Sequence, residues 1–296
     1  MLNYEKLKAF RFPPVNQAYG DREVFLYALA LGVGADPLNE TNLRYVYERK
    51  PRVLPTFAAI LGAPGMWTRE NPDLGIDFEK MVHGEQRIRF HRPLPISASV
   101  VGRNQIGRVV DKGAGKGALV EVIRSVHDTR TDELLATLEY VLFCRADGGF
   151  SDQDLGATGD AAGPPLEAPR DRAPDIELDW APRADAALLY RLCGDRNLIH
   201  ADPEVAARAG FKQPILHGLA TYGIAGAAII RLFCEGETDG LASLSCRFSS
   251  PVFPGETLRI QAWRLTDHVA FRVQVPERGV TAISHGRAEL FHQPAD

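Results

Sequence analysis

The two halves of this 296-residue chain repeat the same order of segments, which constrains the fold more than any other feature. FHRPLP begins at Phe90 and is followed by the alternating run ISASVVGRNQI, while FSSPVFP begins at Phe248 and is followed by GETLRIQAW. The two phenylalanines lie about 158 residues apart, and each half carries an apolar segment upstream, Leu54 to Leu61 and Gly218 to Cys234. Several matches in the same order indicate a duplicated unit.

Each half also offers four strands. Alternating apolar residues, β-branched side chains and Gly, Pro or Asp punctuation support them. The predicted strands are 85–91, 96–110, 117–127 and 134–145 in the first half, and 243–248, 256–265, 269–275 and 281–292 in the second. A sheet with one apolar face needs cover, which a long helix supplies. The pattern is compatible with two α+β units, each a curved antiparallel sheet around one helix.

Residues 147–178 differ in composition from both halves. They are rich in Gly, Ala, Pro and Asp and contain few large apolar residues, which is typical of an interdomain linker running extended over the surface. The predicted organisation is therefore an N-terminal unit over 1–146, a linker over 147–178 and a C-terminal unit over 179–296.

Composition and charge exclude several classes of protein. Hydrophobic residues make up 45% and charged residues 24%, as in ordinary globular proteins. A net charge of −4 without a dense basic run argues against a nucleic-acid partner. The run 218–234 is short for a membrane span and its small residues suit close packing, so we predict a buried helix and no membrane association. Four widely spaced cysteines and the lack of an apolar leader predict reduced thiols and a cytoplasmic protein.

The richest chemistry lies between residues 190 and 222. Asp195, Asn197 and His200 fall within six residues, directly ahead of a helix that Asp202 and Pro203 are expected to begin, as cap and first residue. A turn can direct a carboxylate, an amide and an imidazole into one space, whereas a regular helix would separate positions 195 and 200. These groups are suited to acid–base chemistry on a carbonyl compound.

The second polar element is the start of the long apolar helix. His217 and Gly218 open it, and unpaired N–H groups at a helix start can stabilise a developing oxyanion. Other interpretations of these residues are open: each polar group can serve as a cap or surface group, or the three can form a turn network. Metal binding by Asp195, His200 and His217 is a further alternative, although no HExxH or CxxC spacing supports it.

The stretch YRLCGDRNLIH, residues 190–200, resembles the hydratase 2 signature of the MaoC-like family of (R)-specific enoyl-CoA hydratases and dehydratases. PILHGLATYG at 214–223 resembles the following helix start, and RFSSPVFPGETL at 247–258 the next strand pair. The chain departs from the signature at two positions. Cys193 stands where Ser is usual, and Leu198 stands where Pro is usual, which alters the stiffness of the turn but removes no functional group.

The resemblance extends over most of the first half. YGDREVFLYALALG at 19–32, YVYE with LPTF, and HGEQ at 83–86 are similar to two-repeat hydratase 2 proteins, including the domain carried by peroxisomal multifunctional enzymes. This half has no G-D-x-N-x-x-H and reads ADPLN near Ala35 to Asn39. The resemblance implies a double hot-dog fold, a catalytically silent first repeat that makes room for the acyl chain, an acyl-CoA substrate and a homodimer. It implies no cofactor and no metal.

Residue roles follow from the same resemblance. It implies that Asp195 and His200 form the acid–base pair, that Asn197 orients the water or the pair, and that the N–H of Gly218 holds the thioester oxygen. The resemblance assigns substrate binding to four further residues, His83, Gly84, Lys112 and Phe248. The expected reaction is the reversible hydration of trans-2-enoyl-CoA to (3R)-hydroxyacyl-CoA.

Two other functions are compatible with the sequence. Hot-dog folds also host acyl-CoA thioesterases, since a fold alone does not fix a function. A non-catalytic subunit that binds acyl thioesters is the other alternative, and Leu198 is the feature that favours it. The sequence leaves open the size of the acyl group, the choice between CoA and acyl carrier protein, and which of Asp195 and His200 activates water.

Overall fold

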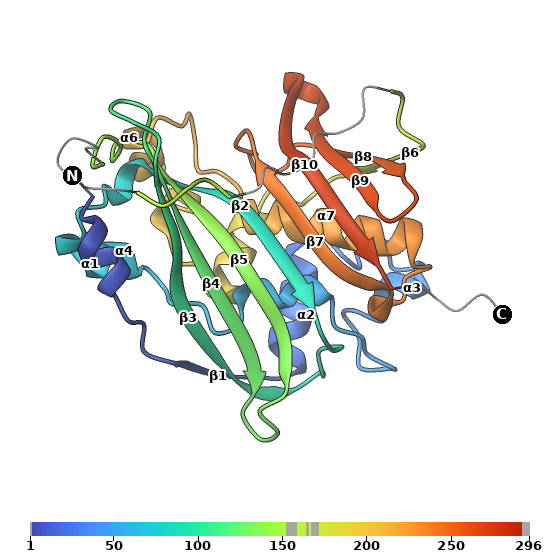
Figure 1. The fold of residues 1–296 in the computed structure, drawn as a ribbon. Helices are drawn as coiled ribbons and strands as arrows, with labels where there is room; N and C mark the ends of the chain where they lie inside the picture. Colours follow the sequence, from blue (N-terminus) through green and yellow to red (C-terminus); the bar gives the residue numbers. More distant parts are fainter. Residues whose placement is uncertain (1, 152–158, 164–165, 167–171, 292–296) are drawn as a thin grey trace.

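The computed structural model describes residues 2–151, 159–163, 166 and 172–291. Within these residues one ten-stranded sheet has the order β1-β3-β4-β5-β2-β7-β10-β9-β8-β6, and every neighbouring pair is antiparallel. The strands are β1 (Val15–Tyr19), β2 (Met81–Phe90), β3 (Ala98–Asp111), β4 (Ala118–Asp128), β5 (Leu134–Cys144), β6 (Ile176–Trp180), β7 (Leu241–Phe248), β8 (Leu258–Arg264), β9 (Val269–Val275) and β10 (Val280–Leu290). The sheet thus joins five strands from each half (Figure 1).

Helices cover the inner side of this sheet. The α-helices are α1 (Tyr4–Ala9), α2 (Asp21–Ala30), α3 (Glu40–Leu43), α4 (Trp67–Glu70), α5 (Ala186–Tyr190), α6 (Pro203–Arg208) and α7 (Gly218–Phe233). Short 3-10 helices complete the described elements: η1 (Pro55–Ile60), η2 (Pro72–Leu74), η3 (Phe78–Lys80), η5 (Arg191–Cys193), η6 (Leu198–His200), η7 (Thr238–Gly240) and η8 (Pro276–Arg278). The α+β fold class is therefore confirmed.

The eight strands predicted from the sequence are confirmed, and β2 shows the largest difference because it begins at Met81 rather than Glu85. The two edge strands, β1 and β6, were not predicted. Each has five residues and pairs with a single neighbour, so its alternation is too short to stand out. β6 overlaps the end of the predicted linker, and the division into 1–146, 147–178 and 179–296 stays a prediction.

The two halves meet along the pairing of β2 with β7. This seam runs from Glu85 opposite Arg247 to Arg89 opposite Ser243. A carboxylate oxygen of Glu85 accepts hydrogen bonds from Nε and Nη2 of Arg247 at 3.0 and 2.8 Å. Charge-assisted hydrogen bonds of this kind are stronger than neutral ones, so the seam is held by side chains as well as by the backbone.

The long helix α7 lies behind β7 and β10 in Figure 1, and most of its residues are buried. The burial of these residues confirms the core helix predicted from the sequence. Among the residues that the structure describes, none of the helices could span a bilayer. Two glycines bring it close to the first half. A Cβ on Gly223 would lie 2.7 Å from the hydroxyl oxygen of Tyr27, and one on Gly226 would collide with Thr56.

The first half differs from the expectation of a long helix in each repeat. Its apolar segment forms only the six-residue η1, which packs against α7. Proline at the start and a left-handed Gly62, with φ of 60°, bound this turn. A side chain at Gly62 would collide with the backbone of Gly102, so the chain leaves the centre of the fold here. One long helix therefore serves a core that both halves share.

Candidate active site

The loop after α5 presents the motif residues. It passes through η5, turns at Gly194, whose φ of 135° favours glycine, and continues into η6. Asp195 Oδ1 accepts the backbone N–H of Asn197 at 3.0 Å, and Asn197 Oδ1 accepts that of Ile199 at 3.2 Å. The side-chain oxygen of Asn197 is therefore occupied by the turn, which leaves its amide N–H groups to contact a water molecule or a ligand.

His200 is buried and held in one tautomer. Its Nδ1 lies 2.8 Å from the carbonyl oxygen of Ile215, and because a carbonyl only accepts, Nδ1 carries the proton. Nε2 is therefore a free acceptor. Burial lowers the pKa of His200 and outweighs the opposing effect of the Asp195 carboxylate. The imidazole is neutral near pH 7 and can act as a base.

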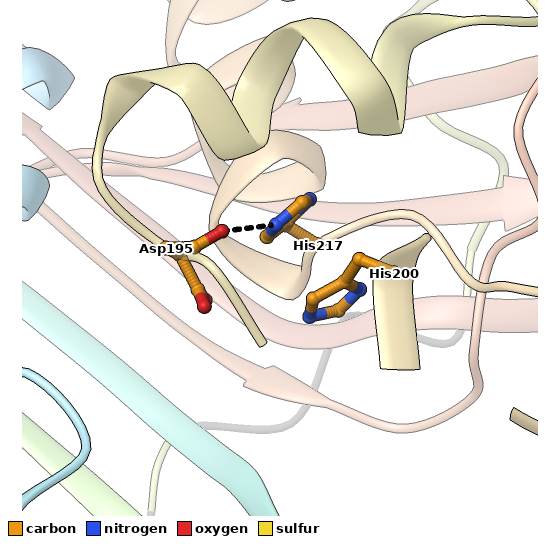
Figure 2. Close-up of side chains that lie close together, drawn as sticks. All are labelled: Asp195, His200 and His217. Atoms are coloured by element: carbon orange, nitrogen blue, oxygen red, sulfur yellow. Dashed lines mark hydrogen bonds between the residues drawn. The ribbon is translucent and has the colours of Figure 1, made fainter. Parts of the chain in front are cut away.

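His217 completes the cluster in Figure 2, in a position for which sequence reasoning offered only a metal-binding role. Its ring stacks on that of His200 with centroids 3.6 Å apart, and its Nε2 donates to the backbone oxygen of Asp195 at 3.2 Å. Burial and the neighbouring His200 lower the pKa of His217 to about 3. His217 therefore holds the loop at Asp195 and the ring of His200 in place. In the sequence, its position directly before the start of the long helix was the feature that could have indicated this role.

The three side chains converge. One carboxylate oxygen of Asp195 and one ring nitrogen each of His200 and His217 all lie within 4.8 Å of one another. A carboxylate with two imidazoles is a donor set that binds zinc. The same set also suits proton transfer without a metal, because a carboxylate and a neutral imidazole both accept protons.

Gly218 lies at the first position of α7, behind His217. Its N–H has no hydrogen-bond partner among the described residues, as expected for the first residue of a helix. A Cβ at this position would lie 3.4 Å from the ring of Phe248. Backbone and aromatic ring therefore leave room for a thin group only.

The predicted binding residues of the first half continue from Phe248. The ring of His83 lies edge-on to that of Phe248, with centroids 5.0 Å apart. Gly84 sits in a bulge of β2 next to Phe143, and the ammonium of Lys112 lies 4.9 Å from the centroid of the Phe143 ring. Burial lowers the pKa of His83 to about 4.

The predicted residues thus contact one another in a series across the seam. The series begins at Gly218 and Phe248, passes through His83 and Gly84, and ends at Lys112. A cavity of about 600 Å³ lies elsewhere, between the first half and the segment that follows it. Its lining contains none of the predicted site residues and comprises Lys8, Gly107, Arg108, Glu121, Ile123, Glu139, Asp160 and Ala161.

One antiparallel sheet shared by two halves, with Asp195 and two histidines at the start of the long helix α7, is the architecture of a double hot-dog protein. Family comparison agrees: residues 162–285 match the MaoC-like domain and residues 17–146 match the MFE-2 hydratase 2 N-terminal domain. The chain belongs to the MaoC-like hydratase 2 family.

Individual relatives cover nearly the whole chain. The chain is 35% identical to the peroxisomal enoyl-CoA hydratase 2 of Arabidopsis thaliana, covering 95% of this chain and 94% of that protein. It is 38% identical to 3-hydroxyacyl-thioester dehydratase Y of Mycobacterium tuberculosis, covering 88% of each. A crystal structure of a MaoC-like dehydratase from Phytophthora capsici superposes with a TM-score of 0.81 at 29% identity, covering 99% of this chain and all of that one. The double hot-dog fold expected from the sequence is thereby confirmed.

Proposed function

We propose that the protein catalyses the reversible hydration of trans-2-enoyl-CoA to (3R)-3-hydroxyacyl-CoA. The observation that carries this proposal is the convergence of Asp195 and His200 on His217, which directly precedes Gly218 at the start of α7. The N–H of Gly218 has no hydrogen-bond partner among the described residues. Membership of a family with relatives named enoyl-CoA hydratase 2 and 3-hydroxyacyl-thioester dehydratase supports the same reaction in its two directions.

Asp195 and His200 are proposed to handle the two proton transfers together. Water attacks C3 and loses one proton to the pair, and the pair returns one proton to C2, so it ends in its starting state. Since Nδ1 of His200 already donates to Ile215, Nε2 enters hydration as an acceptor. Acid–base catalysis of this kind contributes ~10²–10⁴-fold in rate. Asn197, through its amide group, orients the water.

Between the two proton transfers the thioester oxygen carries negative charge. The N–H of Gly218 would stabilise this charge, together with the positive end of the α7 dipole. Loss of one such donor typically costs ~10²–10³-fold. The absence of a Cβ lets the thioester approach the backbone, with the ring of Phe248 on the other side.

Substrate binding is proposed for His83, Gly84, Lys112 and Phe248. The ammonium of Lys112 suits the phosphate groups of CoA. Because it lies over Phe143, it would bind the nucleotide away from the reacting carbons. The first unit, residues 1–146, would supply this surface and the acyl pocket but no proton transfer. The unit 179–296 would supply the catalytic groups.

We also propose a homodimer that acts in the cytoplasm. The dimer rests on the family resemblance. The cytoplasmic assignment rests on four cysteines that are all free, three of them buried, as is common for reduced proteins.

A panel of trans-2-enoyl-CoAs of rising size tests the reaction. The conjugated enoyl absorbance is expected to fall without release of free thiol, and chiral analysis is expected to give the (3R) alcohol. Mainly (3S) product would overturn the assignment. Release of thiol would indicate the thioesterase alternative, and binding without turnover the non-catalytic one.

A further inference from the structure

The loop that carries Lys112 is a glycine-rich hairpin between β3 and β4. Three of its six residues are glycines with φ of 97°, 71° and 80°, at positions 113, 115 and 117. Glycine loses more conformational freedom on ordering than any other residue. A lysine in such a hairpin can hold a fixed position only where other contacts order the loop.

Asp111, the last residue of β3, supplies those contacts. Its carboxylate accepts the backbone N–H groups of Gly113, Gly149 and Ser151 at 2.8, 2.7 and 2.7 Å, and the hydroxyl of Ser151 at 2.6 Å. Burial raises the pKa of Asp111, but the hydrogen bonds from Ser151 and the two glycines outweigh it and hold the pKa at about 2. We call these four residues the Asp111 staple.

The staple joins the hairpin to the start of the segment between the halves. A Cβ on Gly148 would collide with the carbonyl oxygens of Gly113 and Gly117, so backbone lies directly on backbone here. Phe150, two residues after Gly148, stacks with Tyr4, and their ring centroids lie 6.1 Å apart. Phe150 also packs against the apolar cluster of the first half. The segment is thus anchored in the core while it holds the hairpin.

Lys112 follows Asp111 directly. Its backbone N–H donates to Gly117 at 3.1 Å, which closes the hairpin, and its ammonium lies over Phe143 beside Gly84. Within the described residues no carboxylate forms an ion pair with this ammonium. A cation that is held on an ordered hairpin, over a ring that also contacts Gly84, suits an anionic ligand.

We propose that Asp111 is a positioning residue for coenzyme A recognition, acting through the hairpin to hold Lys112 against the phosphate groups of the nucleotide. This inference rests on the proposed function, because it names how that site would recognise the non-reacting part of its substrate. Asp111 itself would not touch the reacting atoms. Its contribution should therefore depend on whether the thioester carries a nucleotide.

The test compares two substrates with the same reacting end. They are trans-2-butenoyl-CoA and the trans-2-butenoyl thioester of N-acetylcysteamine, which lacks the nucleotide. In Asp111→Asn the amide nitrogen would face the N–H groups of Gly149 or Ser151. Losing hydrogen bonds to a charged group corresponds to about a tenfold effect. We expect KM for the CoA thioester to rise about tenfold, with kcat nearly unchanged and no change for the short thioester.

A matched control exists at the opposite end of the same sheet. Asp128 ends β4 and accepts the N–H groups of Arg130 and Thr131 at 2.8 and 3.2 Å in the next hairpin. Asp128→Asn should leave both KM values unchanged. Ser151→Ala, which removes only the hydroxyl, should give a smaller rise of about threefold for the CoA thioester, within the usual range for a neutral hydrogen bond. Ser151→Ala replaces Asp111→Asn in this test if the Asp111→Asn protein folds poorly.

Two outcomes overturn the proposal: equal KM changes for both thioesters, or no change for either in Asp111→Asn and Ser151→Ala. If the wild type hydrates neither thioester, the proposed function fails. Calorimetric titration with CoA alone then decides the role of the staple. Weaker binding by Asp111→Asn than by Asp128→Asn would support it, whereas equal binding by all proteins, or none by the wild type, would overturn it.

Discussion

The two halves contribute matching strands to one sheet, yet the segments that cover those strands differ. In the second half the segment before the seam strand is α7, which begins at Gly218 with an N–H that no described residue accepts. In the first half it is η1, which begins with Pro55, and proline has no N–H to donate. If the proposed role of Gly218 is right, the comparison explains why the first half lacks this chemistry: the segment at the matching place begins without a backbone donor.

The loops that precede these segments differ in the same sense. Asp195 and His200 approach His217 in the second half, while the first half has Ala35 to Asn39, without histidine, at the matching place. The first half instead provides His83, Gly84 and Lys112, on strands and a hairpin. One half is expected to carry the proton transfers and the other to carry recognition. Two predictions test this division and two test the stability of the residues that form the site, from the largest expected effect to the smallest.

Removal of the carboxylate of Asp195, the proposed acid–base group, should have the largest effect. Asp195→Asn keeps the size of the side chain and a carbonyl oxygen for the N–H of Asn197, but it cannot take up a proton. We expect kcat to fall ~10²–10⁴-fold with an unchanged circular dichroism spectrum. Asp202→Asn is the control, because asparagine caps a helix as well as aspartate does. More than a tenth of wild-type kcat in Asp195→Asn would contradict the proposed role.

The helix start is tested next. In Gly218→Val the added methyl groups would meet Phe248, whose ring lies 3.4 Å from the Cβ position, and would keep the thioester from the N–H. We expect kcat/KM to fall ~10²–10³-fold. Gly20→Ala, at the cap of α2 in the first half, meets only the Glu23 carboxylate at 3.7 Å and should leave the rate within twofold. Full activity in Gly218→Val would break the comparison.

Stability should depend on pH through the buried histidines. Because the folded pKa values of His217 and His83, about 3 and about 4, lie below the unfolded value of 6.5, the unfolded state binds more protons between these limits. Stability is full above pH 6.5 and falls as pH drops toward the folded values. At pH 5 each residue should cost ~2 kcal/mol. Urea unfolding at pH 7 and 5 measures this, and His217→Gln should flatten the dependence; an unchanged slope would contradict it.

The smallest effect concerns the departure at Leu198. This residue is 42% exposed and lies at the first position of η6, where proline is tolerated. The preceding Asn197 has ψ of 126°, as a residue before proline requires. Leu198→Pro should therefore stabilise the fold by ~0.4–1 kcal/mol, visible as a rise in Tm of a few degrees, without loss of activity. A drop in Tm would show that this turn needs leucine.

Strong local patterns made much of the fold predictable. The eight long strands alternate clearly, and α7 follows a marked apolar run, so each was expected within a few residues of its true ends. The hot-dog assignment came through the motif around Asp195 rather than through the strands. The five-residue strands β1 and β6 were missed because their pairing is decided by a neighbour far along the chain.

The candidate site could also be predicted in part from the sequence. Proximity of Asp195 and His200 could be expected from a turn, whereas the stacking of His217 on His200 depends on how α7 meets that loop. The length of η1 could not be judged from its apolar residues, since the close contact of Gly62 with Gly102 is what stops it. The Asp111 staple likewise joins residues 38 and 40 positions apart, beyond any local pattern.

The single chain that runs through both sides of the seam has an evolutionary consequence. In an assembly of identical subunits every substitution appears in each copy, so a site and its counterpart must change together. In this protein the two halves are separate stretches of one chain, so each can mutate without the other. The ion pair of Glu85 with Arg247 holds the halves together. Each side can therefore accept substitutions separately. On the proposed division of roles, mutations in the first half would change the substrate range and leave the proton-transfer residues unchanged.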